Sequence, residues 1–200
     1  FVSESDMFPT PKACPTAIKD STFAIQANGT DFYLNVHGTD TVADGRNVNV
    51  YSKDDALAQR WIPKQTTEGP KLFTKINEDF ALNIHTVDNN CTMHTDSVDN
   101  DNDSILEFVE VADMQYKIKM FNHNKYLAID GTAASGSNVV WVDGSANATV
   151  WNFIPETTAF PTPIPAPSTI VDKPFFIRNF NTKYNLNVHG TNTVATGRNV

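Results

Sequence analysis

The stretch YLNVHGTDTVADGRNVNVYSKDDALAQRW, residues 33–61, determines how the whole chain is interpreted. Short apolar runs alternate in it with Asn, Asp, Gly and Thr, a pattern typical of strands joined by turns. Its first half recurs: residues 34–48 and 186–200 agree at thirteen of fifteen positions, 152 residues apart. A period of that length is a domain and not a solenoid unit, so we predict a tandem duplication in which only the opening of the second copy is present.

A shorter period runs inside the first copy. Apolar patches around Leu34, Leu82 and Leu127 follow one another at steps of 48 and 45 residues. Each unit closes on a short segment, and these segments are Gln59-Arg60-Trp61, Leu106-Glu107-Phe108 and Thr149-Val150-Trp151. Three units of four strands give a domain of about 135 residues, whereas a propeller ordinarily needs at least four blades. We predict an all-β trefoil with pseudo-threefold symmetry and almost no helix.

Residues 33–61 resemble the unit of the ricin B-chain type β-trefoil lectins. That unit starts apolar-Asp-Val, continues with a Gly-led x-Gln-x-aromatic strand and closes on Gln-x-Trp. The resemblance covers residues 20–155 and resumes at residue 174. It implies a lectin module that recognises galactose-like or related sugars on glycans or glycoproteins, weakly at each site and more strongly when tandem copies bind together.

Four segments follow from these patterns. We assign residues 1–20 to an N-terminal tail, 21–155 to the trefoil, 156–173 to a linker and 174–200 to the start of a second, incomplete trefoil. The linker is rich in Pro and Thr, which favours an extended polyproline conformation. The last segment could dock on the first domain, form a dimer by exchange with a neighbour, or belong to a longer second domain. We favour the longer second domain.

The first unit carries the side chains that a sugar pocket needs. Strand alternation points Asn49 and Tyr51 outward, which makes Tyr51 a stacking platform. The resemblance places Asn35 where the family has Asp, and Gln59 at the amide of the closing motif. Because an amide accepts fewer hydroxyl hydrogen bonds than a carboxylate, we expect weaker binding or a different sugar, with His37 replacing a lost contact. The alternative is that Asn35 and Asn49 only satisfy turn backbone.

The other two units are less complete. The second has His94 where an aromatic is expected and no amide in its closing segment, so we expect no sugar there. In the third, the candidate residues are Asp130, Asn138, Trp141 and Asn147. Trp141 lies five residues after Gly136, whereas Tyr51 lies six residues after Gly45. This difference shifts the strand register by one residue and could turn the Trp141 side chain into the core.

Charge and hydropathy exclude several classes of partner. The net charge is −8 with a pI near 4.9, and the Lys and Arg residues are scattered, which argues against nucleic acid. No apolar run reaches the roughly 20 residues of a membrane span, so we expect no membrane insertion.

The start of the chain favours secretion, while the sequons and cysteines add little to that expectation. The chain begins with Phe1, which suggests a removed leader. Sequons occur at Asn28, Asn90, Asn102 and Asn147, a number near that expected by chance. Cys14 and Cys91 could form a disulfide in an oxidising compartment, with two free thiols as the alternative.

Catalysis and metal binding have little support in the sequence. Residues 99–110 place carboxylates at calcium-loop positions, but Ser104 replaces the required Gly and no flanking helices are expected, so we favour a solvated acidic loop. No HExxH, CxxC, GxSxG or phosphate loop occurs. We therefore expect no metal, no cofactor and no enzyme. The rival to a lectin is a sugar-inert trefoil, a structural or protein-interaction domain of a larger secreted hydrolase or toxin.

Overall fold

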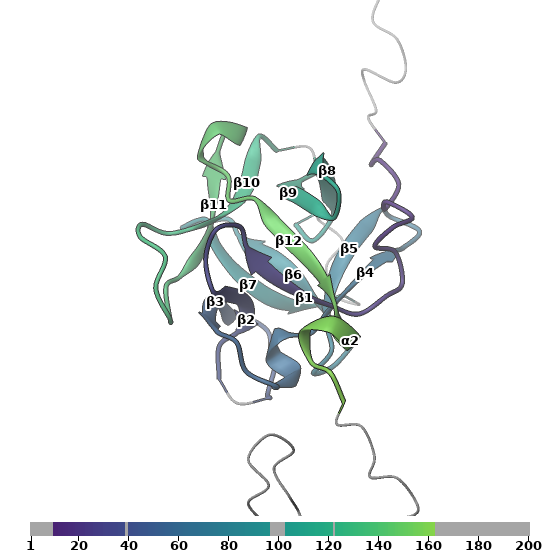
Figure 1. Ribbon diagram of the computed structural model, residues 1–200. Coiled ribbons are helices and arrows are strands. Elements are labelled where there is room, and N and C mark those ends of the chain that lie inside the picture. The colour runs from purple at the N-terminus through teal and green to yellow at the C-terminus, as the bar shows by residue number, and fades with distance from the viewer. Residues whose placement is uncertain (1–9, 39, 97–102, 122, 163–200) are drawn as a thin grey trace, which may run out of the picture. The chain divides into compact units, whose positions relative to one another are not determined.

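The computed structural model describes residues 10–38, 40–96, 103–121 and 123–162 (Figure 1). All of these except Thr162 lie in one compact unit, Phe1–Pro161. The strands are β1 (Phe23–Ala27), β2 (Phe32–Val36), β3 (Arg46–Ser52), β4 (Trp61–Gln65), β5 (Pro70–Thr74), β6 (Phe80–His85), β7 (Asn90–Thr95), β8 (Leu106–Ala112), β9 (Gln115–Met120), β10 (Lys125–Ile129), β11 (Val139–Asp143) and β12 (Trp151–Pro155). Helix is limited, in the part described, to η1 (Leu57–Gln59), η2 (Ser145–Asn147) and α2 (Glu156–Ala159).

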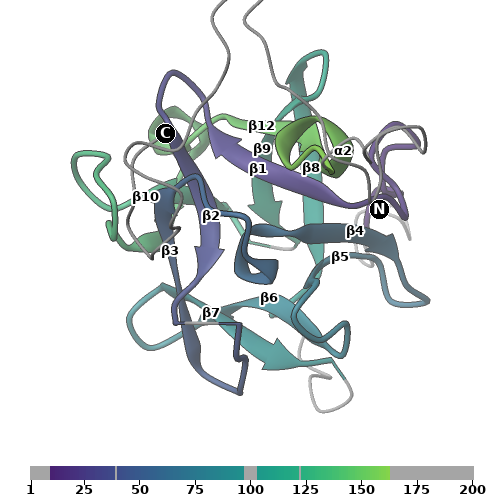
Figure 2. The same cartoon turned by 60° about the horizontal axis from the view of Figure 1, so that its bottom comes forward.

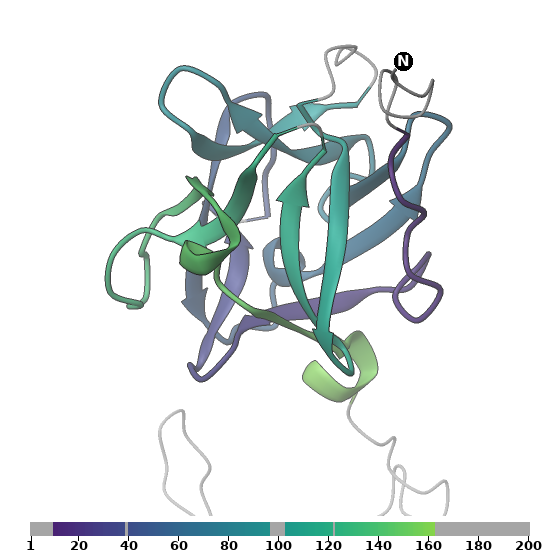
Figure 3. The same cartoon turned by 90° about the horizontal axis from the view of Figure 1, so that it is seen from above.

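The strands form three units of four strands each, and the units follow one another around a closed sheet. β1 pairs with β12 along its whole length and also meets β2 and β4, so the first and last units close on each other. The hairpins β4–β5 and β8–β9 join successive units. Figure 2 shows the first two units following one another from β1 to β7, and Figure 3 shows the β8–β9 hairpin in teal. This topology confirms the predicted β-trefoil.

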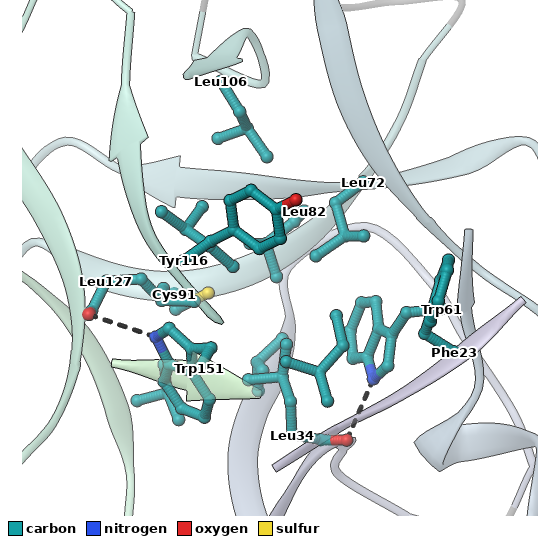
Figure 4. Packing of buried hydrophobic residues seen from close by; sticks show 14 of the residues in the cluster. Phe23, Leu34, Trp61, Leu72, Leu82, Cys91, Leu106, Tyr116, Leu127 and Trp151 are labelled. Carbon is teal, nitrogen blue, oxygen red and sulfur yellow. Dashed lines mark hydrogen bonds between the residues drawn. The ribbon is translucent and has the colours of Figure 1, made fainter. Parts of the chain in front are cut away.

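Two tryptophans hold equivalent places in the core. Trp61 and Trp151 begin β4 and β12, are fully buried, and donate their indole N–H to the carbonyl oxygens of Leu34 at 2.9 Å and Leu127 at 3.4 Å (Figure 4). These leucines belong to the second strands of the same two units. Each indole therefore ties the last strand of its unit to the second, and satisfies a carbonyl that is otherwise costly to bury.

The second unit closes two residues earlier than predicted. β8 begins with the fully buried Leu106, which takes the position of the two tryptophans. Phe108, which we aligned with Trp61, is only half-buried and packs edge-on against Tyr116 and Phe153. The alignment was wrong because both side chains are apolar, and sequence spacing alone does not tell which of them enters the core.

Residues on both sides of the predicted bounds 21–155 pack against the trefoil. At its start, the backbone N–H of Cys14 donates to Gln65 Oε1 at 2.9 Å, and Ile18 is fully buried. At its end, α2 and the following Phe160 pack on β1 and β2 rather than forming extended linker. Residues 163–173 of the predicted linker and the repeated segment 174–200 lie outside the described residues.

Two further expectations concern cysteines and membranes. Cys14 and Cys91 are both buried free thiols, which is the second of the two alternatives that the sequence left open. Burial raises the pKa of Cys14 to about 11, and it raises that of Cys91 well above its ordinary value. Among the described residues there is no helix of the length and apolarity that crossing a bilayer requires.

Candidate functional site

A pocket of about 610 Å³ lies on the first unit, where β2, β3 and the loop before η1 meet. We call it the first-unit pocket, and its lining is Asn35, His37, Gly38, Asp40, Asn49, Tyr51, Asp54, Asp55, Ala56 and Gly136. The structure thus brings together four of the residues that the sequence singled out: Asn35, His37, Asn49 and Tyr51.

The register of the β2–β3 hairpin explains why these side chains meet. Asn35 lies directly opposite Asn49, and Tyr33 opposite Tyr51. Opposite residues share one face of a sheet, while their neighbours point to the other. The neighbours Val48 and Val50 are fully buried in the core. Tyr51 is 48% exposed, so its ring is open to the pocket as a platform.

Three polar side chains form a chain of hydrogen bonds along this wall. Asn35 Nδ2 donates to Asn49 Oδ1 at 2.9 Å and to the carbonyl oxygen of Val36 at 3.0 Å. Asn49 Nδ2 lies 3.3 Å from His37 Nδ1 and donates to it. A neutral imidazole that accepts at Nδ1 carries its proton on Nε2. The wall therefore offers a ligand an acceptor, Asn35 Oδ1, and a donor, His37 Nε2–H.

Gln59 lies behind the pocket and not in its lining. The side chain is fully buried, and both ends of its amide are bonded to backbone. Nε2 donates to the carbonyl oxygen of Ser52, and Oε1 accepts the N–H of Asp54, each at 2.8 Å. Unlike the predicted role as a sugar contact, this arrangement makes Gln59 a positioning residue that holds the loop bearing Asp54.

Three carboxylates on the rim of the pocket were not anticipated. Asp40 accepts the backbone N–H of Ala58, in η1, at 3.1 Å. Asp55 pairs with Arg60, and Asp54 precedes Asp55 in the loop between β3 and η1. The run Lys53-Asp54-Asp55, just before the closing motif, was the signal that could have indicated Asp54 and Asp55.

The third unit contributes to the pocket through its backbone and not through the predicted residues. The loop before β11 crosses to β3: the N–H of Gly136 donates to the carbonyl oxygen of Val50 at 2.7 Å, and that of Val50 to Ser137 at 2.9 Å. Gly136 has φ +89°, a conformation that favours glycine, and an added Cβ would meet no atom within 4 Å. A loop far away in sequence therefore forms part of the first-unit pocket.

The predicted third-unit residues are dispersed and do not line the first-unit pocket. Trp141 is 2% exposed and donates its indole N–H to the carbonyl oxygen of Asn83 at 3.2 Å, so it belongs to the core. Asn138 Nδ2 donates to Asn90 Oδ1 at 2.8 Å. Asn147 caps the carbonyl of Asp143 on the surface, and Asp130 is exposed. The shifted register places Trp141 inward, the second of the two outcomes left open by the sequence.

The acidic stretch considered for calcium lies partly outside the described residues, since 97–102 are not described. Within the described part of the chain, no group of three or more His, Cys, Asp or Glu side chains is arranged to hold a metal ion.

The fold is shared with several solved structures. An agglutinin of Rhizoctonia solani matches with a TM-score of 0.56 and 21% identity, over 74% of this chain and all of that one. The ricin B-like lectin of Macrolepiota procera, solved with lactose, matches at 0.52 and 15% identity, over 68% of this chain and 96% of that one. An exo-β-1,3-galactanase from Clostridium thermocellum matches at 0.56 and 17% identity, over 72% of this chain but 31% of that one.

No protein-family model matches the chain, and no curated protein does. At these identities the likeness to solved structures establishes the β-trefoil fold, and the argument for function depends on the site itself.

Proposed function

We propose that this chain is a carbohydrate-binding lectin module that holds a sugar ring in the first-unit pocket, and that it is not an enzyme. The observation that carries the proposal is the meeting of an exposed aromatic ring, Tyr51, with the hydrogen-bonded wall of Asn35, Asn49 and His37 in one hollow. A sugar presents an apolar ring face and a rim of hydroxyls, and such a hollow complements both.

Two other features agree with this function. The wall side chains are preorganised by their own hydrogen bonds, which reduces the entropy lost on binding. The fold is also that of proteins described as an agglutinin and as a lectin bound to lactose. We propose galactose-like sugars as the first class to test, glycans or glycoproteins as partners, and a secreted location. Weak binding at one pocket would be strengthened by the predicted second copy.

The test is a glycan-array screen with the whole chain, followed by titration of each sugar that binds. Tyr51→Ala removes the aromatic ring face, which contributes about 1.4 kcal/mol to the binding free energy, so the affinity should fall about tenfold. Tyr51→Phe keeps the ring and should retain most of the affinity. Val87→Ala trims another exposed apolar side chain, outside the pocket lining, and serves as the control. Binding that survives Tyr51→Ala unchanged would remove the pocket from the proposal.

A second candidate is a sugar-inert trefoil within a larger secreted hydrolase or toxin. The observation in its favour is the galactanase, in which the matching part is less than a third of the chain. If the folded wild-type chain binds no glycan on the array, this candidate replaces the lectin.

A further inference from the structure

We propose that the first-unit pocket selects sugars by charge, binding those that carry a free amine most tightly, neutral sugars less tightly, and carboxylated sugars least. This inference rests on the proposed lectin function and specifies the class of ligand for the same pocket. Its basis is the distribution of charged side chains around the hollow.

The lining contains three carboxylates and, among the described residues that form it, no lysine or arginine. Of the basic side chains nearby, Arg60 and Lys53 are engaged elsewhere, whereas the guanidinium of Arg46 lies beside Gly38 and lines a neighbouring hollow with Asp44. Arg60 pairs with Asp55 and with Glu156 and lies 4.6 Å from the centre of the Phe160 ring. Lys53 faces the same ring at 5.7 Å, in a neighbouring hollow. The lining therefore presents more carboxylates than cations to a ligand, with Arg60 paired to one of the three acids and Arg46 just outside the lining.

Asp54 is the carboxylate with the charge most available to a ligand. Asp40 is occupied by a backbone N–H and Asp55 by Arg60. The carboxylate of Asp54 has no hydrogen bond or ion pair within the described part of the chain, while its backbone N–H is held by Gln59. The buried amide thus fixes the loop, and Asp54 lines both the first-unit pocket and the neighbouring hollow that contains Lys53.

An independent feature of the opposite wall also points to a ligand with donors. Asn35 lines the pocket, and only 9% of its surface is exposed. Both of its amide protons are donated within the protein, and its Oδ1 finds no partner among the described residues. An ammonium group carries three donors and no acceptor. Because it is a donor-rich group, it can donate in this pocket to Asn35 Oδ1 and to carboxylates of the lining, whereas a sugar carboxylate brings further acceptors to a lining that already has them.

Coulomb's law sets the size of the effect. Two unit charges about 4 Å apart in a water-like dielectric change an affinity about fivefold, and partial burial increases this. Added salt reduces it, because the Debye length shrinks to about 3 Å at 1 M.

The experiment is calorimetric titration of the whole chain, near pH 7 and at low salt, with galactose, galactosamine, N-acetylgalactosamine and galacturonic acid, and with the matching glucose series. An amine of this type is mostly protonated at about pH 7. We expect the free-amine sugar to bind about fivefold more tightly than its N-acetylated or neutral counterpart, and the uronic acid more weakly by a similar factor. Added salt should reduce both differences.

Asp54→Asn removes the charge and keeps the size and backbone of the residue, so it should bring the amine and neutral sugars to within about twofold. Asp113→Asn makes the same change at an exposed position outside the pocket lining and should leave the ratios unchanged. Thermal unfolding of both variants checks that they are folded.

The outcomes separate the two proposals. If no sugar of either series binds, the lectin function itself fails. If neutral sugars bind and the amine and carboxylate forms bind equally well, the lectin function stands and selection by charge is overturned. If Asp54→Asn and Asp113→Asn change the ratios equally, Asp54 is not the selecting residue.

Discussion

At the scale of single residues, the Asn at position 35, where the lectin unit that the sequence resembles has Asp, has a structural consequence. The Asn35 amide group donates to Asn49 Oδ1 and to the Val36 carbonyl, two acceptors that a carboxylate could only repel. Residue 35 thus holds the β2–β3 hairpin in this chain as well as facing the pocket. In the proposed selection by charge, Asp54, which lines the same pocket, would supply the carboxylate that position 35 lacks.

Asn35→Asp should lower the free energy of unfolding by about 1–2 kcal/mol, because it replaces two donated hydrogen bonds with repulsive contacts. Asn49 can turn its amide to donate, but the Val36 carbonyl remains unsatisfied. Urea denaturation measures the change. Asn77→Asp is the matched control, since its Oδ1 only accepts the N–H of Asp79, which Asp also does. Unchanged stability with tighter sugar binding would show that the Asn35 bonds are dispensable.

At the scale of elements, tryptophans and ion clusters join the hairpins, and one of these clusters forms around Glu78. Glu78, in the turn before β6, accepts from Lys64 of β4 at 2.8 Å and from Lys75 at 2.6 Å. These hydrogen bonds, with Lys64 the larger cause, lower the pKa of Glu78 from 4.5 to about 2. The cluster connects β4 with the β5–β6 turn, across the junction of the first two units.

The sign of the pH dependence follows from that lowered pKa. The stability contributed by Glu78 is present above pH 4.5 and is lost as the pH falls towards 2. Because Glu78 is 41% exposed, water screens the pairs, and Glu78→Gln should cost about 0.5–1 kcal/mol at neutral pH. Denaturation at a series of pH values should show the two proteins converging between pH 4.5 and 2. A difference that stays constant with pH would exclude the ion cluster as its source.

At the scale of the whole molecule, the position of the domain end depends on α2 and Phe160. Phe160 is 8% exposed, clusters with Ala24 and Tyr33, and lies under Arg60. In Figure 1, α2 lies at the end of β12, where that strand runs beside β1. The segment therefore covers the seam that closes the trefoil.

Phe160→Ala should lower the free energy of unfolding by about 2–3 kcal/mol, because it exposes this cluster and removes a cation–π contact. Thr158→Ala, at an exposed position of α2, is the control and should change stability by less than about 0.5 kcal/mol. Thermal unfolding of the whole chain measures both. Equal stability of the two variants would mean that the domain ends at Pro155, as the sequence suggested.

The repeat determined the fold from the sequence alone, because the threefold recurrence of strand and turn signals is local. Alternation along β3 likewise indicated an outward Tyr51 and inward Val48 and Val50. Both predictions depend on the two-residue alternation of side chains along a strand. Neighbouring residues set this alternation without reference to the rest of the chain.

Only the tertiary structure decided which residues come together when the barrel closes. Gly136 reaches the first-unit pocket from the third unit, Trp141 turns inward, Leu106 takes the place of Phe108, and Gln59 is buried behind a loop of acids. The contacts of Gly136, Leu106 and Trp141 join residues far apart in sequence, and they are set by the registers of strands that pair only when the three units close on one another. The spacing before Trp141 left two outcomes open, and the pairing decided between them. Gln59 bonds to Ser52 and Asp54, which are close in sequence, but its burial becomes visible only in the folded loop.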